Sequence, residues 1–147
     1  MPSVRTVGAI VIGLIVGVAL ITLVELAGLA LHPLPEGFDP GDREAVKAHA
    51  AQAPPLARVV VVAAWTLGAL GGTFTASRLG SPGQHAYSLA TGGLLLVGTV
   101  VTLFQIPSGP AMTIAGLVLP PLGSVFGCFL GRRPAGPDAE EAAPLPL

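Results

Sequence analysis

The chain has 147 residues, of which 52% are hydrophobic and 10% are charged, whereas soluble domains carry roughly 25% charged residues. Seven basic residues against eight acidic residues give a net charge of −1, so no basic field exists that could hold a nucleic acid. The single cysteine, Cys128, cannot form an intrachain disulfide. This composition excludes a nucleic-acid-binding protein and a disulfide-linked secreted scaffold, and it predicts an integral membrane protein.

Four apolar stretches are long enough to cross a bilayer, because about 20 apolar residues span its ~30 Å hydrocarbon layer as a helix. These stretches are residues 7–31, 59–78, 86–106 and 111–130. Lipid offers no partner to free backbone groups, so we expect helices rather than strands. We predict an all-α, polytopic membrane protein in which residues 1–131 form one four-transmembrane-helix bundle. The first stretch is too long for the apolar core of a secretory signal, and we interpret it as a retained helix.

The connections between these stretches differ in length. Short Pro/Gly-rich turns near residues 80–83 and 105–110 predict that the last three helices are antiparallel neighbours. In the longer first connection, Asp39-Pro40 resembles a helix N-cap followed by a first-turn proline, and an alanine-rich run follows. We therefore expect a short surface helix over residues 40–53. Residues 132–147, rich in proline, alanine and acidic residues, are expected to be disordered.

Small residues recur at every fourth position in three of the predicted spanning helices. Helices in lipid associate mainly through close packing, which small residues permit. We predict packing contacts, within the chain or between copies, at Gly13, Gly17, Gly68, Gly72, Gly123 and Gly127. In the last helix, Pro120-Pro121 predicts a kink, because each proline removes one backbone donor.

Glu25 is the one ionisable residue of the first apolar stretch, and a carboxylate near mid-membrane costs roughly 2.5–3.5 kcal/mol. In a continuous helix His32, seven positions later, lies on the same face. At a similar depth in the second helix, the indole N–H of Trp65 needs an acceptor. With the polar residues of the other helices at this level, we predict a polar network of Glu25, His32, Trp65, Thr66, Thr102 and Gln105.

Three interpretations of this network stay open. Glu25 either links helices through hydrogen bonds, or binds a proton or cation in transport, or ligates a metal together with His32. The metal interpretation is poor because only two ligands are in register, and His49 would have to fold back from the first connection. We therefore assign no metal, no cofactor and no catalytic residue, and we expect no enzymatic activity.

Several short strings also resemble known sequences: Leu23-Val24-Glu25, His32-Pro33-Leu34-Pro35, Ala64-Trp65-Thr66-Leu67-Gly68 with Gly71-Gly72, and Ile106-Pro107. Over about residues 7–133 the chain resembles an uncharacterised family of small bacterial four-helix integral membrane proteins. In that pattern an Asn precedes the Ile-Pro turn and a His follows it, whereas this chain has Thr102 and Ser108 there. The departure argues against a metal site. The architecture is also similar to that of small multidrug-resistance transporters, whose sequence motif is absent.

The basic residues divide between the two ends of the predicted bundle: Arg5, Arg78, Arg132 and Arg133 at one end, and Arg43, Lys47 and Arg58 at the other. The positive-inside rule predicts that both termini lie in the cytoplasm of a bacterial plasma membrane. Expected partners are the lipid bilayer and a homo-oligomer or another membrane protein, with no nucleic acid. We interpret the chain as an integral membrane protein. The alternatives are a small proton-coupled transporter or transporter subunit acting as an oligomer, and an accessory subunit of a larger membrane complex.

Overall fold

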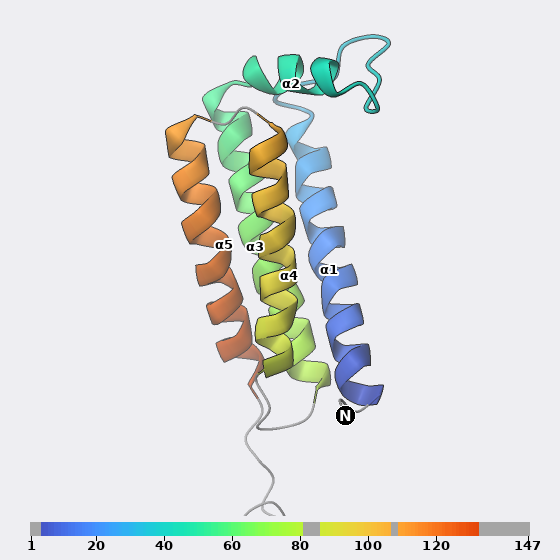
Figure 1. The fold of residues 1–147 in the computed structure, drawn as a ribbon, viewed down its shortest axis with the longest axis vertical. Helices are drawn as coiled ribbons and strands as arrows, with labels where there is room; N and C mark the ends of the chain where they lie inside the picture. Colours follow the sequence, from blue (N-terminus) through green and yellow to red (C-terminus); the bar gives the residue numbers. More distant parts are fainter. Residues whose placement is uncertain (1–3, 81–85, 107–108, 133–147) are drawn as a thin grey trace, which may run out of the picture.

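The computed structural model describes residues 4–80, 86–106 and 109–132 (Figure 1). Over these residues the chain is all-α, as predicted. The helices are α1 (Val4–Gly28), α2 (Arg43–Ala51), α3 (Pro55–Leu79), α4 (Ala86–Gln105) and α5 (Pro110–Gly131). The prediction of four helices long and apolar enough to cross a membrane is confirmed for α1, α3, α4 and α5. The predicted disordered tail, apart from Arg132, lies outside the described residues.

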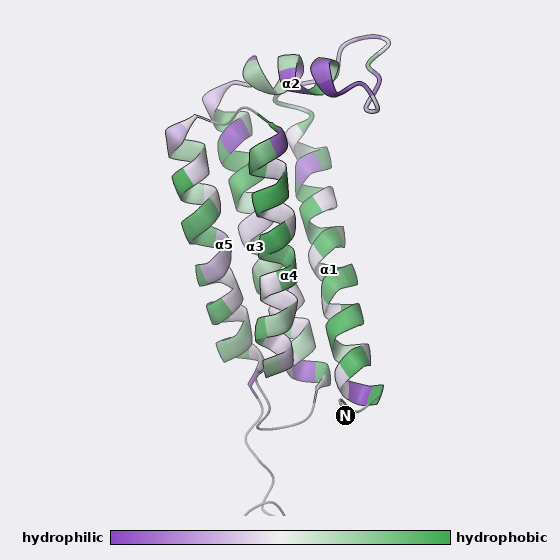
Figure 2. Ribbon diagram, in the orientation of Figure 1, coloured by the Kyte–Doolittle hydropathy of each residue, from purple (hydrophilic) through white to green (hydrophobic). Residues whose placement is uncertain are grey.

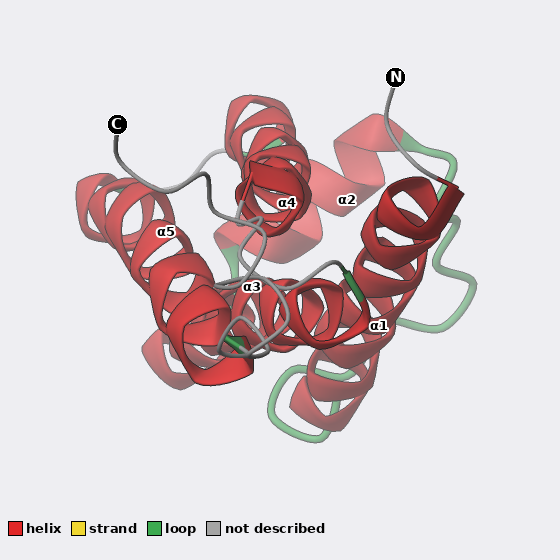
Figure 3. Ribbon diagram, turned by 90° about the horizontal axis from the view of Figure 1, so that it is seen from below, coloured by secondary structure: helices red, strands yellow, loops and turns green. Residues whose placement is uncertain are grey.

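Helix α3 is the centre of the bundle. Seen along the bundle axis, α1 and α5 flank α3 and α4 lies beside it (Figure 3), and the contacts of α3 with α1 and with α5 are by far the most extensive between helices. Accordingly α3 has the largest set of buried residues, including Ala64 and Thr73, both fully buried. Helix α4 packs much less extensively on its neighbours α1, α3 and α5 than α3 packs on α1 and α5.

Helix α1 differs from the predicted range 7–31, since it begins at Val4 and ends at Gly28. After Gly28 the backbone tightens into bonds between residues three apart, with Leu31 N–H donating to the Gly28 carbonyl at 2.9 Å. His32 therefore lies beyond the helix. The helical phase that was predicted to align His32 with Glu25 does not extend that far.

Helix α2 crosses one end of the bundle (Figure 1). It is shorter than the predicted range 40–53, and its N-cap is Asp42 rather than Asp39. The Asp39 carboxylate accepts instead from the Gly41 N–H at 2.8 Å, so a turn forms before the helix starts. Asp42 then accepts from the Glu44 N–H at 2.9 Å and caps α2.

The contact between α1 and α3 is a reciprocal crossing of four glycines. A Cβ on Gly13 would lie 2.7 Å from the Gly72 carbonyl oxygen, and a Cβ on Gly72 would lie 2.8 Å from that of Gly13. Gly17 and Gly68 face each other in the same way, at 3.0 Å and 2.7 Å. No side chain fits between backbones this close, so these four glycines permit the close approach of α1 and α3 within one chain.

Helix α5 packs on the opposite face of α3 through a second row of glycines. A Cβ on Gly123 would lie 2.6 Å from the Thr66 carbonyl oxygen, and a Cβ on Gly127 would overlap the carbonyl oxygen of Leu70. Pro120 and Pro121 lie inside α5, which continues past them to Gly131 as one helix. The predicted kink stays a prediction.

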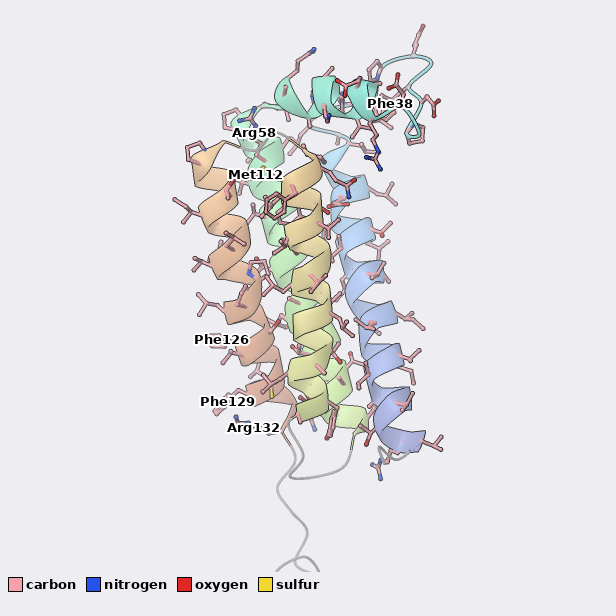
Figure 4. The ribbon with its side chains drawn as sticks, in the orientation of Figure 1. Phe38, Arg58, Met112, Phe126, Phe129 and Arg132 are labelled. Atoms are coloured by element: carbon pink, nitrogen blue, oxygen red, sulfur yellow. The ribbon has the colours of Figure 1, made fainter. Side chains whose placement is uncertain are left out.

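The outer surface of the four long helices is apolar (Figure 2). Exposed side chains include Phe126 and Phe129, each 63% exposed, which point away from the bundle in Figure 4. Arg58 and Arg132 lie at opposite ends of the bundle (Figure 4). Such large apolar area with charge at its two ends is typical of a membrane-embedded protein rather than of a water-soluble one.

A candidate membrane-embedded site around Glu25

The structure brings Glu25 and Trp65 together across the α1–α3 contact. Glu25 is half-buried, and its carboxyl group lies within interaction range of the Trp65 side chain, with which it lines one pocket. Trp65 is only 5% exposed, so its indole N–H depends on a protein acceptor. Of the six residues predicted to form a polar network, Glu25 and Trp65 are the two whose side chains interact with each other.

Glu25 lies beside open space rather than within the glycine crossing. It lines a pocket of about 250 Å³ together with His32, His49 and Arg58. It also lines a pocket of about 670 Å³ between α1, α3 and α4, which includes Trp65, Thr99 and Thr102. Glu25, Val61 and Ile106 line both pockets. The two spaces therefore adjoin at Glu25, and we call them together the Glu25 groove.

The walls of the Glu25 groove are mainly apolar, formed by residues such as Leu29, Val60 and Leu94. A carboxyl group surrounded by such walls has few competing dipoles, which strengthens its interaction with any cation or proton that enters. In chemical terms the groove can accept an apolar body with one positive or hydrogen-bond-donating group directed at Glu25.

His32 does not bond to Glu25; it pairs with His49 of α2. The two imidazole rings stack with centroids 3.9 Å apart and planes 14° apart, and His32 Nε2 lies 3.0 Å from the His49 carbonyl oxygen. His49 thus folds back toward the end of α1, as the metal interpretation of the network would have required. Among the described residues, however, no group of three His, Cys, Asp or Glu side chains could hold a metal ion.

The remaining predicted members of the network do not join Glu25 through hydrogen bonds. The Thr66 hydroxyl donates to the Val62 carbonyl of its own helix at 2.8 Å, and Thr66 packs against Gly123 on the α5 side of α3. Thr102 likewise donates to the Gly98 carbonyl at 3.0 Å. Gln105 is exposed and lines a third pocket with Arg43 and Lys47, which shares Ile106 with the Glu25 groove but does not include Glu25. A threonine in a helix readily satisfies its hydroxyl within that helix, which the sequence pattern did not reveal.

The structure also contains a polar contact between helices that the sequence analysis missed. Near the other end of the bundle, the Ser77 and Ser88 hydroxyls lie 2.7 Å apart, and Ser77 lies 3.4 Å from the Cys128 carbonyl oxygen. This contact links α3, α4 and α5. Serines within glycine- and alanine-rich helices were the available signal, because a small hydroxyl residue permits close approach and bonding together.

Comparison of this chain with protein-family models, with curated proteins and with solved structures finds no match. The properties of the site therefore rest on its residues and their geometry.

Proposed function

We propose that the chain is a multi-pass protein of a bacterial plasma membrane and acts as a small proton-coupled transporter, with Glu25 as the group that binds a proton or a cation. The observation that supports this proposal is that Glu25 lines the groove, whereas the glycine crossing brings the backbones of α1 and α3 into direct contact at other positions. A carboxylate that served only as a link between helices would not need a groove beside it.

The position of the groove favours an oligomer. The bundle has α3 at its centre (Figure 3), so a single chain has no central pathway, and the groove runs along its edge between α1 and α4. Farther along α1, the close approach of Gly13 to Gly72 closes the α1–α3 contact. Transport across the whole membrane therefore requires a second conformation and a second copy facing the groove.

A structural role is the second candidate, and the pairing of Glu25 with Trp65 favours it. In that case the carboxyl group serves as the acceptor of a buried indole N–H, and the groove is occupied by lipid. The two candidates differ in whether the proton on Glu25 matters, and this difference can be measured.

The test uses Trp65, the only tryptophan of the chain, as a fluorescent reporter beside Glu25. Purified protein is titrated with tetraphenylphosphonium, an apolar cation, between about pH 5 and about pH 9. We expect binding that weakens as the pH falls, since protons compete for the same carboxylate, and Glu25→Gln should fold normally but bind at least tenfold more weakly with no dependence on pH.

Glu36→Gln is the matched control, because Glu36 is an exposed residue of the first connection and should bind like the wild type. Equal, pH-independent binding by the wild type and Glu25→Gln would refute the transport proposal and leave the structural role.

A further inference from the structure

The stacked pair of His32 and His49, which we call the histidine pair, joins α2 to the end of α1. His32 follows α1 and His49 lies in the last turn of α2. Phe38 adds a tilted ring contact to His49 at 5.4 Å. Elsewhere α2 is held to the bundle by Arg58 of α3, whose guanidinium donates to the Ala51 carbonyl at 3.1 Å. Among the described residues, few polar contacts therefore attach α2 to the rest of the bundle. The histidine pair supplies two of these contacts: the stacking of the rings and the contact of His32 with the His49 carbonyl oxygen.

The histidine pair also covers one end of the Glu25 groove. His32, His49 and Ala53 line the same pocket as Glu25, and α2 lies across that end of the bundle (Figure 1). Moving α2 away from α1 would remove this cover. The position of the pair thus links the attachment of α2 to the access of water and ions to Glu25.

The charges around the pair do not favour two protonated rings. Among the residues that line the pocket, α1 contributes Glu25 and α3 contributes Arg58, while the uncharged Ile106 follows α4 and the uncharged Met112 belongs to α5. On α2 itself, Lys47 is paired with Glu44 at 2.9 Å, and Arg43 lines a different pocket. One carboxyl group thus faces two imidazoles and a guanidinium.

The acidic residues of the connection offer little compensation. The Asp39 carboxylate accepts from the Gly41 N–H and the Asp42 carboxylate caps α2, and both are exposed, as is Glu36. The pKa of His49 is lowered below its ordinary value of 6.5, mainly by burial and to a smaller extent by the neighbouring His32. Two imidazolium rings in a parallel stack repel each other, and a protonated His32 still has the His49 carbonyl as an acceptor.

We propose that the histidine pair is a pH-sensitive latch: protonation of both rings releases α2 from the end of α1 and opens the Glu25 groove to the aqueous side that α2 faces. The latch regulates the site described above, and its consequence for transport rests on the proposed function. The release itself depends only on the two histidines and on where α2 attaches.

The test directly measures the distance between α2 and the turn that follows α1. Spin labels are attached to Ala30→Cys and Ala48→Cys, both exposed positions, in a Cys128→Ser background that removes the only native cysteine. Double electron–electron resonance on the full chain should give one short distance near pH 8, and a second, longer distance held by most molecules near pH 5.

The informative variant is His49→Phe. It keeps an aromatic ring in the stack and the backbone carbonyl that His32 bonds, but it removes the titrating group. We expect the short distance at both pH values. Quenching of Trp65 fluorescence by acrylamide should increase at least twofold on acidification in the wild type and stay constant in His49→Phe. Circular dichroism checks that both proteins keep their helices at each pH.

Failure of the latch and failure of the proposed function give different results. A wild-type distance that does not change with pH refutes the latch, and so does a change that persists in His49→Phe, since a group other than the pair of rings would then be responsible. If Glu25→Gln still opens on acidification but tetraphenylphosphonium never binds, the latch stands and only the transport proposal is lost.

Discussion

At the scale of single residues, the candidate site depends on how each polar group is satisfied inside an apolar protein. Among the described residues no buried side-chain nitrogen or oxygen lacks a hydrogen-bond partner. Most threonines achieve this within their own helix, as Thr73 does with the Ala69 carbonyl at 2.7 Å. Trp65 has no such option, because an indole N–H cannot reach the carbonyls of its own helix, and the acceptor group beside it is the carboxyl group of Glu25 on α1.

The pairing of Glu25 with Trp65 predicts the stability of two variants. Glu25→Ala leaves the buried indole N–H without an acceptor and should lower the free energy of unfolding by about 1–3 kcal/mol. Glu25→Gln retains an acceptor oxygen and should change it by less than about 1 kcal/mol. Unfolding in mixed micelles, followed by circular dichroism, measures both. Equal unfolding of Glu25→Ala and the wild type would show that the pair contributes nothing to stability.

The histidine pair predicts how stability depends on pH. Because the pKa of His49 is lower in the folded protein than its ordinary value of 6.5, the unfolded chain binds this proton more readily than the folded one. The contribution of His49 to stability is therefore complete above that ordinary value and is lost as the pH falls through the folded-state value. In His49→Phe this loss should be absent. Midpoints of thermal unfolding at several pH values, compared between the two proteins, provide the check.

At the scale of elements, the backbone of α3 is approached closely from two sides. Gly68 and Gly72 meet the glycines of α1, while Gly123 and Gly127 of α5 rest on the carbonyl oxygens of Thr66 and Leu70. Neither contact can widen without separating two helices, since the nearest atoms belong to the backbone. These crossings hold α1 in place, and α1 carries Glu25 to the level of Trp65.

Gly72→Leu should therefore destabilise the bundle. Its side chain would meet the Gly13 carbonyl oxygen and the Cα of Gly17, so we expect a loss of about 3 kcal/mol, the upper end of the usual overpacking range. Gly93→Leu is the matched control, because a Cβ at Gly93 meets nothing within 4 Å, and it should be neutral. Thermal unfolding in detergent that is identical for Gly72→Leu and the wild type would contradict the assigned crossing.

At the scale of the whole molecule, an apolar surface separates two charged ends. Arg5 Nε donates to the Leu79 carbonyl at 3.0 Å, which places it beside Arg78 at the end of α3, whereas Arg58 and α2 lie at the other end (Figure 4). The basic residues that the structure describes thus lie at two opposite ends of the bundle, as the sequence predicted. The side of the membrane that each end faces is a prediction from the positive-inside rule.

Labelling of a cysteine added after Leu147, in a Cys128→Ser background, measures that orientation. With both termini in the cytoplasm, an impermeant maleimide should label the added cysteine in broken cells but not in intact ones. A cysteine at Ala48, which is exposed on α2, should show the opposite pattern. Labelling of the added cysteine in intact cells would reverse the assigned orientation, and partial labelling of both positions would indicate dual topology.

The sequence by itself determined the helices and their packing residues. Long charge-free apolar runs can only be helices in lipid, and rows of glycine indicate close contacts, as at Gly13 and Gly72. The sequence also named Trp65 as one of several candidate partners of Glu25, because each is a polar group at a similar depth in an apolar environment.

Only the tertiary structure decided which polar groups meet. Thr66 faces α5 instead of Glu25, because the direction of a side chain around a helix depends on the rotation of that helix in the bundle. His32 stacks on His49 because α1 ends at Gly28 and α2 folds across the end of the bundle. Helical periodicity describes neighbours within one helix, and it holds no information about a residue reached through a turn. Contacts of that kind depend on long-range packing, which covers one end of the Glu25 groove with the histidine pair.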